Sequence, residues 1–195
     1  MTLNEWDEYA DEWDSNGSTS TYADNAYREL VKTIKLDGQR VFDFGCGTGL
    51  LAERLSPVVQ EIVALDGSLK MIGQLKRKAL SNVFPIASFL TRDLIANNTL
   101  LHTRFDLLTA SSVCAFLPDY DETLTLLRSL LLPGGVYVQW DWLSPDESSE
   151  GGFTERRVRQ ALGRADFKSI SISQPFVMES SPDNLTVLMA VAEAG

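Results

Sequence analysis

A loop with glycine at every second position is the first place where residue types and spacing in this chain could do chemistry. Residues 41–44 form a short apolar run that contains Asp43, and Gly45, Gly47 and Gly49 follow. Glycine lets the backbone approach a ligand closely because no side chain stands in the way. The N–H groups at the start of the next helix then face that ligand. The pattern predicts a strand, a Gly-rich turn and a helix, which open a nucleotide-binding βαβ unit.

The carboxylate of Asp66 is the second chemically suggestive group. It ends another apolar run and follows Gly45 by 21 residues, which is where a nucleotide-binding sheet places its ribose-binding acid. A carboxylate can accept both ribose hydroxyls in charge-assisted hydrogen bonds. Ser68 follows as an N-cap for the next helix. The position of Asp66 alone does not say which nucleoside-containing cofactor is bound.

The glycine spacing distinguishes between cofactors. A dinucleotide-binding loop has the spacing G-x-G-x-x-G, whereas this chain has G-x-G-x-G. Asp43, two residues before the first glycine, would repel a pyrophosphate nearby. Residues 41–49 resemble the first motif of class I S-adenosylmethionine (SAM)-dependent methyltransferases, in the form D-x-G-C-G-T-G. The run Asp66-Gly67-Ser68 with Met71, and the L-x-P-G-G pattern at 131–135, resemble further signatures of that family.

This resemblance implies SAM as the cofactor and S-adenosylhomocysteine as the product. In the family, an acid near the end of the third strand accepts from the adenine amino group, and the backbone of its neighbours reads the ring; Asp93 fits that place. An alternative role for Asp93 is to cap the short helix that follows. An aromatic residue of the N-terminal segment, here Tyr9, often lies near the methionine part. The expected cofactor-binding residues are Tyr9, Asp43, Gly45, Cys46, Gly47, Gly49, Asp66, Gly67, Ser68, Met71, Arg92, Asp93, Leu94 and Ser111.

The implied reaction is an in-line displacement of the methyl group from a sulfonium. The main work of the protein is to align the reactants and exclude water, and a base is needed only if the acceptor carries a proton. Residues 111–119 contain neither the His nor the Asn/Asp-Pro-Pro-Tyr/Phe motif that family members use here. The usual base therefore cannot be carried over. The candidates are Asp141 and Asp119, with Tyr120 and Cys114 as weaker ones, and no metal site is expected.

Composition limits the classes of partner. Seventeen Lys and Arg against 27 Asp and Glu give the 195-residue chain a net charge of −10, which repels nucleic acids and anionic membranes. No apolar run approaches the length of a membrane span. Two cysteines provide no disulfide framework, so we expect a reducing cytoplasm. The expected partner is a small-molecule substrate, bound by a monomer or a homodimer.

The expected architecture is α/β: a Rossmann-like, seven-stranded, mostly parallel sheet with an antiparallel C-terminal hairpin and helices on both faces. Residues 1–36 are expected to form a helical cap or lid, and residues 37–195 the SAM-binding core. In the cap, an apolar stripe predicts one helix over residues 1–14, and the polar residues 15–20 predict a flexible hinge. The stripe consists of Trp6, Tyr9, Ala10 and Trp13.

The remaining elements follow from periodicity and turn residues. Strands are predicted at 40–44, 61–66, 88–91, 105–110, 136–140, 167–173 and 184–192, with a Pro-Asp turn at 182–183 joining the last two. Helices are predicted at 21–36, from Leu50 to before Pro57, after Ser68, at 119–132 and at 153–165. The helix after Ser68 should bury Leu69, Ile72 and Leu75.

Together these observations favour a SAM-dependent methyltransferase acting on a small molecule. One alternative is a SAM-binding protein that lacks catalysis, or that acts on a protein or nucleic-acid partner. Another is an NAD-linked oxidoreductase, which the glycine spacing and Asp43 disfavour.

Overall fold

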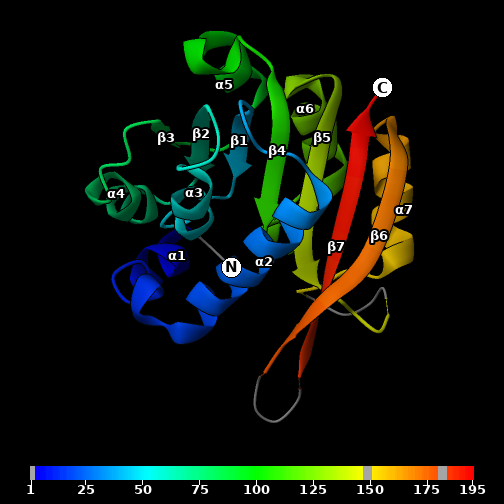
Figure 1. The fold of residues 1–195 in the computed structure, drawn as a ribbon, viewed down its shortest axis with the longest axis horizontal. Coiled ribbons are helices and arrows are strands. Elements are labelled where there is room, and N and C mark those ends of the chain that lie inside the picture. Colours follow the sequence, from blue (N-terminus) through cyan, green and yellow to red (C-terminus); the bar gives the residue numbers. More distant parts are fainter. Residues whose placement is uncertain (1–2, 147–150, 180–183) are drawn as a thin grey trace. The chain divides into compact units, whose positions relative to one another are not determined.

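The computed structural model describes residues 3–146, 151–179 and 184–195. Its strands form one seven-stranded sheet in the order β3-β2-β1-β4-β5-β7-β6 (Figure 1). The pairs β1–β2, β2–β3 and β4–β5 are parallel, whereas β7 runs antiparallel to both β5 and β6. The predicted Rossmann-like fold with an antiparallel C-terminal hairpin is confirmed. The chain divides into two compact units, Met1–His102 and Thr103–Gly195, which are described in turn.

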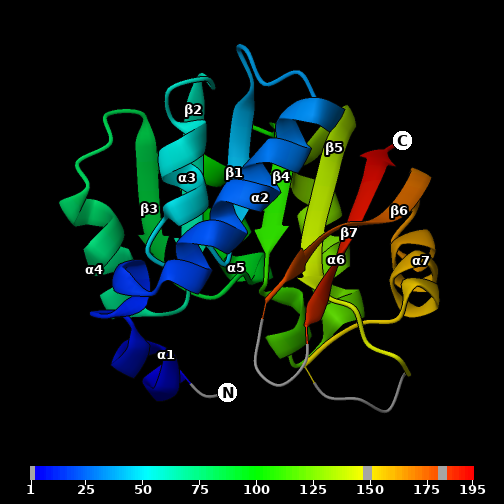
Figure 2. The ribbon, with the colours of Figure 1, turned by 60° about the horizontal axis from the view of Figure 1, so that its bottom comes forward.

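The first unit contains three parallel strands and five α-helices. Its strands are β1 (Arg40–Phe44), β2 (Glu61–Asp66) and β3 (Val83–Ala87). Its helices are α1 (Leu3–Tyr9), α2 (Gly17–Thr33), α3 (Leu50–Leu55), α4 (Leu69–Arg77) and α5 (Arg92–Asn97), with 3₁₀ turns η1 (Trp13–Ser15) and η2 (Thr99–Leu101). Helices α2 and α3 lie side by side (Figure 2), where Arg54 bonds Asp24 at 2.7 Å and the carbonyl oxygen of Ser20 at 3.2 Å. The predicted strands β1 and β2 and the predicted helix α3 are confirmed.

The prediction of the third strand at 88–91 is wrong. The strand covers Val83–Ala87 and includes Pro85, which pairs in register with Ala64 of β2. Proline is tolerated there because β3 is at the edge of the sheet, where one side of the backbone needs no donor. The next segment is helical because the Thr91 hydroxyl accepts a hydrogen bond from the N–H of Leu94 at 3.0 Å and so caps α5.

The N-terminal segment also differs from its prediction. Helix α1 ends at Tyr9, and Trp13 lies in the turn η1, with its ring centroid 5.8 Å from that of Trp6. The predicted hinge at 15–20 is instead the beginning of α2, because Asn16 caps the helix by accepting from the N–H of Ser18 at 3.0 Å. The serine and threonine residues that follow Asn16 therefore belong to the first turn of α2 and do not form a flexible connection.

Helix α4 buries a slightly different stripe than predicted. Ser68 is its N-cap, as expected, and accepts from the N–H of Met71 at 3.1 Å. Met71, Ile72 and Leu75 are buried, but Leu69 is 72% exposed. At 100° per residue, Leu69 lies about 110° from the centre of this stripe, which explains its exposure.

The second unit contains four strands and two longer helices. Its strands are β4 (Phe105–Ser111), β5 (Leu131–Trp142), β6 (Phe167–Met178) and β7 (Leu185–Ala194). Its helices are α6 (Tyr120–Leu130), α7 (Glu155–Arg164) and the 3₁₀ turn η3 (Cys114–Phe116). Helices α6 and α7 pack on each other and on the strands of the C-terminal half (Figure 1). The predicted helices and hairpin are confirmed, with longer strands; the Pro-Asp turn at 182–183 lies outside the described residues.

The Pro-Gly-Gly sequence lies inside β5 instead of preceding it. Pairing with β4 passes from Phe105↔Leu131 to Leu107↔Val136, so residues 132–135 bulge out of the strand. Gly134 has φ of 75°, and a Cβ on Gly135 would come within 2.9 Å of the carbonyl oxygen of Leu132. Glycine is required at both positions. Within the part of the chain that is described, every helix is too short or too polar to cross a bilayer.

Replacing Gly49 by Ala should destabilise the protein by more than about 2 kcal/mol, as measured by urea unfolding. Gly49 has φ of 81°, and an added Cβ would lie 2.3 Å from Cδ1 of Leu75. The matched control is Gly73→Ala in α4, which has open space around it and should gain up to about 1 kcal/mol from helix propensity. Equal effects of the two substitutions would contradict the proposed close contact.

Candidate functional site

The Gly-rich loop between β1 and α3 has the backbone conformation that its glycines predict. Gly45, Gly47 and Gly49 have φ of 68°, 55° and 81°, which favour glycine strongly. The N–H groups of Gly45 and Cys46 both donate to the carbonyl oxygen of Leu65, at 2.8 and 3.1 Å. The loop is therefore tied to the end of β2.

Asp66 joins this loop to the beginning of α4. Its Oδ2 accepts from the N–H of Gly47 and its Oδ1 from the N–H of Ser68, both at 2.8 Å. Burial raises the pKa of Asp66 and the negative charge of Asp7 adds to that effect, while the two N–H donors oppose it. Each carboxylate oxygen has a second lone pair, so each can accept one further hydrogen bond. Asp66 can therefore receive two neighbouring hydroxyl groups.

The N-terminal segment is bound to the same two loops by aspartates. Asp7 accepts from the Ser68 hydroxyl and, at 3.3 Å, from the N–H of Lys70. Its pKa is lowered, first by the Ser68 hydroxyl. The hydroxyl of Thr48 in the Gly-rich loop donates to Asp14. The segment is thus anchored both at the Gly-rich loop and at the start of α4.

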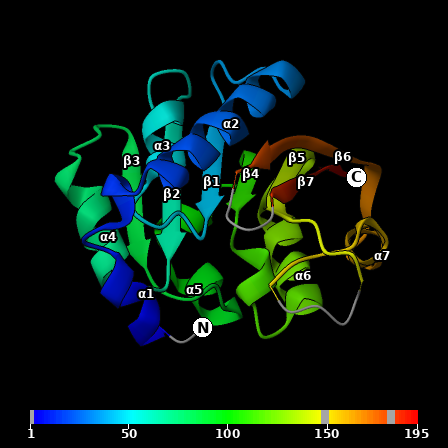
Figure 3. The ribbon, with the colours of Figure 1, turned by 90° about the horizontal axis from the view of Figure 1, so that it is seen from below.

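Two further contacts extend this anchoring along α4. Asp11 accepts from Gln74 at 2.7 Å. Lys78, at the C-cap of α4, bonds both Asp14 and Glu53 at 2.9 Å. Figure 3 shows α1 beside α4, in agreement with these bonds. Asp7, Asp11 and Asp14 therefore all contact the surface made by the Gly-rich loop and α4, although only Asp7 lies within α1.

Asp43 and Cys46 lie beside Asp66. Asp43 is buried at 1% exposure, at the end of β1. Burial raises the pKa of the Cys46 thiol well above its usual range, and the carboxylates of Asp43 and Asp66 raise it further. Cys46 is therefore a neutral thiol, suited to packing and not to nucleophilic attack.

Several of the predicted cofactor residues have other contacts. Tyr9 is 50% exposed and its ring meets that of Trp6 edge-on at 6.5 Å. Met71 is buried in the core. Arg92, Asp93 and Leu94 form the first turn of α5, whose cap is Thr91 and not Asp93. The residues that the structure brings together around the carboxylate of Asp66 are Gly45, Cys46, Gly47, Gly49, Gly67 and Ser68.

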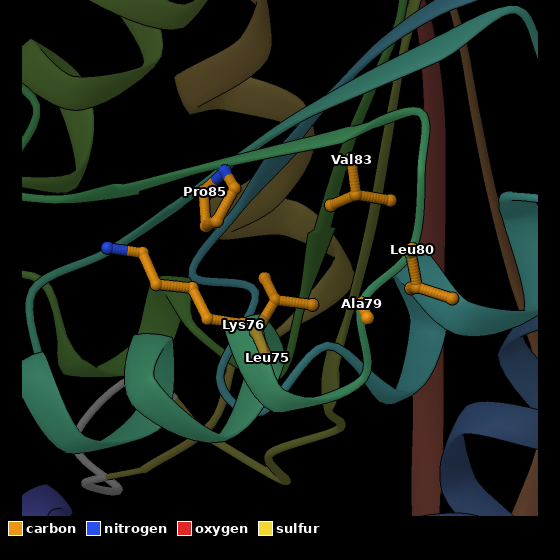
Figure 4. A pocket seen from close by; sticks show the side chains of 6 residues that line it. All are labelled: Leu75, Lys76, Ala79, Leu80, Val83 and Pro85. Carbon is orange, nitrogen blue, oxygen red and sulfur yellow. The ribbon is translucent and has the colours of Figure 1, made fainter.

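A shallow depression beside α4 contains none of the predicted cofactor residues. It lies between α4 and β3 and is lined mostly by apolar side chains (Figure 4). The lining residues are Leu75, Lys76, Ala79, Leu80, Val83 and Pro85. None of these six residues belongs to the Gly-rich loop or to the turn that contains Asp66.

In the second unit, the candidate bases Asp141 and Asp119 have different surroundings. Asp141 is fully buried on β5 and accepts from Nε2 of Gln139 at 2.9 Å and from the N–H of Ala115 at 3.4 Å. Burial raises its pKa to about 7, although these donors and Cys114 lower it. Asp119 is exposed and caps α6 by accepting from the N–H of Glu122 at 2.8 Å. Only Asp141 belongs to a buried polar network.

The other predicted residue of this unit, Ser111, is half-buried at the end of β4 and pairs in register with Trp140. Sequence reasoning missed Gln139, Asp7 and Asp14. A glutamine inside the apolar run of β5 is a signal that could have been recognised, because buried polar groups need partners. Asp7 and Asp14 offer no such signal, because their partners Ser68 and Thr48 lie in distant parts of the sequence.

Comparisons with known proteins agree with this arrangement. Residues 42–137 match the family described as "Methyltransferase domain". The chain is 34% identical over 133 residues to a cypemycin N-terminal methyltransferase from Streptomyces sp, covering 66% of this chain and 52% of that protein. It is 26% identical over 137 residues to a ubiquinone biosynthesis O-methyltransferase from Actinobacillus pleuropneumoniae serotype 5b, covering 64% of this chain and 56% of that protein.

The fold is likewise similar to that of a solved complex of DhpI with SAM and HEP, with a TM-score of 0.74 at 20% identity. This similarity covers 97% of the chain and 94% of DhpI. Residues 42–137 are therefore similar to a methyltransferase domain, and the chain has the fold of the solved complex of DhpI with SAM. It spans slightly more than half the length of the two curated relatives described above.

The burial of Asp141 predicts a pH dependence of stability. With its folded-state pKa raised from 3.8 to about 7, Asp141 binds a proton more tightly in the folded than in the unfolded protein. Its contribution to stability is full below pH 4 and is lost as the pH rises through 7. Between pH 5 and pH 8 the wild type should lose about 2–3 kcal/mol more than Asp141→Asn in urea unfolding. Parallel stability curves for the two proteins would show that Asp141 does not titrate in this way.

Proposed function

We propose that this protein transfers the methyl group of SAM to a small-molecule acceptor. The observation that carries the proposal is the position of Asp66, whose two oxygens are fixed by the N–H groups of Gly47 and Ser68. A carboxylate held in this way is prepared to accept the two hydroxyls of a ribose. Because the donors are backbone groups, this orientation does not depend on a mobile side chain.

The charge around the Gly-rich loop supports a cationic cofactor. Asp43 is buried next to the loop, and Asp7 and Asp66 both bond Ser68. This concentration of carboxylates would repel a pyrophosphate and attract a positively charged group. When bound, SAM would supply a methyl group on a sulfonium cation. NAD, which contains a pyrophosphate, fits these charges poorly.

In this proposal, residues of the Gly-rich loop and Asp66 hold the cofactor. Arg92, Asp93, Leu94 and Ser111 remain proposed contacts through the family resemblance. The N-terminal segment is proposed to be a lid whose Tyr9 lies near the methionine part. Its anchoring to Ser68 and Thr48 supports this role, because both residues belong to the loops that would contact the cofactor.

The relatives support a small acceptor with a removable proton. Their names specify an N-terminal methyltransferase and an O-methyltransferase. A nitrogen or oxygen acceptor often has to lose a proton, which requires a base. We propose Asp141 for this role in preference to Asp119, because its pKa of about 7 matches neutral conditions and the carboxylate of Asp119 caps a helix.

Two further features belong to the same proposal. A cytoplasmic location is supported by Cys46 and Cys114, which are both free. The protein is proposed to act as a monomer or a homodimer, with residues 1–36 as the cap and residues 37–195 as the core.

Asp66→Asn should weaken SAM binding about ten- to a hundredfold, as measured by titration calorimetry. The amide N–H₂ would face one of the two backbone donors, and the charge that strengthens the hydroxyl bonds would be lost. Asp37→Asn, at an exposed turn, is the matched control and should bind SAM normally. S-adenosylhomocysteine should bind the wild type and NAD should not. Binding of NAD alone would refute the proposed function, and full SAM affinity in Asp66→Asn would refute the ribose assignment.

Replacing both Asp7 and Asp14 by Asn should release the N-terminal segment and raise the dissociation constant of SAM by about three- to tenfold. The substitution removes the negative charge from the acceptors of Ser68 and Thr48 and from the ion-pair partner of Lys78, and the amide N–H₂ cannot accept in place of the second carboxylate oxygen. Calorimetry gives the affinity, and limited proteolysis near residue 16 reports release of the segment. Glu8→Gln, on an exposed side of α1, is the control. Faster proteolysis with unchanged affinity would show that the segment is docked but is not a lid.

A further inference from the structure

A buried network of polar side chains connects three elements of the second unit. Tyr137, Gln139 and Asp141 alternate along β5, so their side chains lie on one face of the strand. Tyr120 at the start of α6 and Cys114 in η3 meet them there. All five residues are at most 6% exposed. Polar groups at this depth need defined partners, and the partners here form a chain.

Two tyrosine hydroxyls determine the orientation of the Gln139 amide. Its Oε1 accepts from the hydroxyl of Tyr120 at 2.6 Å and from that of Tyr137 at 3.0 Å. Both lone pairs of the amide oxygen are then used. The amide nitrogen consequently faces Asp141 and donates to Oδ2 at 2.9 Å. Rotating the amide by 180° would place its oxygen against the carboxylate.

This orientation makes the two oxygens of Asp141 unequal. Oδ2 has a short, charge-assisted bond from Gln139. Oδ1 faces the turn η3, where the N–H of Ala115 is 3.4 Å away, longer than usual for such a bond. A proton added at Oδ2 would oppose the N–H of Gln139, which lowers the pKa of Asp141 more than any other donor; the N–H of Ala115 and the backbone N–H and thiol of Cys114 also bond this carboxylate.

We infer that Gln139, oriented by Tyr120 and Tyr137, is a positioning residue that occupies Oδ2 of Asp141 and leaves Oδ1 to take up the proton of the methyl acceptor. This inference rests on the proposed function. It specifies the acceptor class as one that carries a removable N–H or O–H proton, in contrast to a carboxylate or thiolate, which would need no base.

The proton transfer balances with the methyl transfer. The N–H or O–H bond of the acceptor breaks and an O–H bond forms at Oδ1. The acceptor atom keeps the electron pair with which it bonds the methyl group, and the broken carbon–sulfur pair stays on sulfur, which becomes a neutral thioether. Asp141 later releases the proton to solvent.

Access to Oδ1 requires the turn η3 to move, because Asp141 is fully buried beneath it. The backbone is strained where this turn begins, and the N–H of Ser112 is bonded to the carbonyl oxygen of Trp140 at 2.7 Å. Ser112 has a positive φ of 54°, which is unfavourable for serine, and Val113 provides no side-chain cap for η3. Such a movement would break the bonds that Ala115 and Cys114 donate to Asp141.

The groups that face Asp141 do not titrate near neutral pH. Burial raises the pKa of the Cys114 thiol and of the hydroxyls of Tyr120 and Tyr137 well above their usual ranges. Arg157 of α7 acts on Tyr120 and lowers its pKa, but less than burial raises it. A midpoint near pH 7 in this network can therefore be assigned to Asp141.

Gln139→Met tests the inference, because methionine has a similar length but cannot donate to Oδ2. The carboxyl ¹³C resonance of Asp141 is followed against pH in full-length protein with S-adenosylhomocysteine present, and Asp141→Asn identifies it. The midpoint should rise by about one to two pH units, since the ionised form loses its strongest donor. Gln160→Met, on the exposed side of α7, is the matched control and should leave the midpoint unchanged.

The second readout is the pH dependence of methyl transfer to benzylamine and to catechol, which offer an N–H and an O–H acceptor. The acidic limb of kcat should follow the Asp141 midpoint in the wild type and move with it in Gln139→Met, while KM for SAM stays the same. An unchanged midpoint would overturn the inference. The inference would also be overturned if the Asp141 midpoint shifted in Gln139→Met while the acidic limb of kcat stayed at the wild-type pH. Asp141 would then titrate without taking the acceptor's proton.

A separate variant guards against a folding defect of Gln139→Met. Tyr120→Phe removes one of the two bonds that orient the amide and should raise the midpoint in the same direction by a smaller amount. If neither variant moves it, the network does not position Asp141. Failure of the wild type to bind SAM would refute the proposed function and with it the acceptor step, while the ¹³C titration would still report the role of Gln139 on its own.

Discussion

The pair of hydrogen bonds from Gly47 and Ser68 to Asp66 is the interaction on which the arrangement of the loops in the first unit depends. It connects the Gly-rich loop after β1 with the cap of α4 after β2, and these two segments are not adjacent in the sequence. The carboxylate is held by backbone groups, so its direction follows from the positions of the strands. Asp7 and Asp14 then bond the two loops that this carboxylate has fixed.

The second unit uses a different principle. Its carboxylate, Asp141, is oriented by side chains and is enclosed by the core, so burial controls its protonation more strongly than any single donor. Burial raises the pKa of both acids, but backbone donors oppose this rise at Asp66, whereas the pKa of Asp141 reaches about 7. Two acids of the same type thus differ in chemistry because backbone donors surround one and a buried amide and turn surround the other.

The sequence predicted those parts of the protein whose signal is local. The Gly-rich loop, the strands β1 and β2 and the cap at Ser68 follow from residues within a short window, and each was found where expected. The third strand was misplaced because Pro85 is acceptable only on an edge, which is a property of the whole sheet. Asp7 could not be assigned a role in advance because its partner Ser68 is 61 residues away, and the orientation of the Gln139 amide could not because it depends in part on Tyr120 of α6.

The absence of space at Gly49 has a mechanical consequence. A methyl group there would overlap Leu75, so the first turn of α3 and the middle of α4 are in contact without any compressible layer between them. A displacement of the Gly-rich loop toward α4 cannot be absorbed locally and must be passed on to the whole helix. Lys78 is at the far end of that helix and holds Asp14. The Gly-rich loop, α4 and the N-terminal segment are therefore connected in series, by the packing of Gly49 on Leu75 and by the ion pair of Lys78 with Asp14.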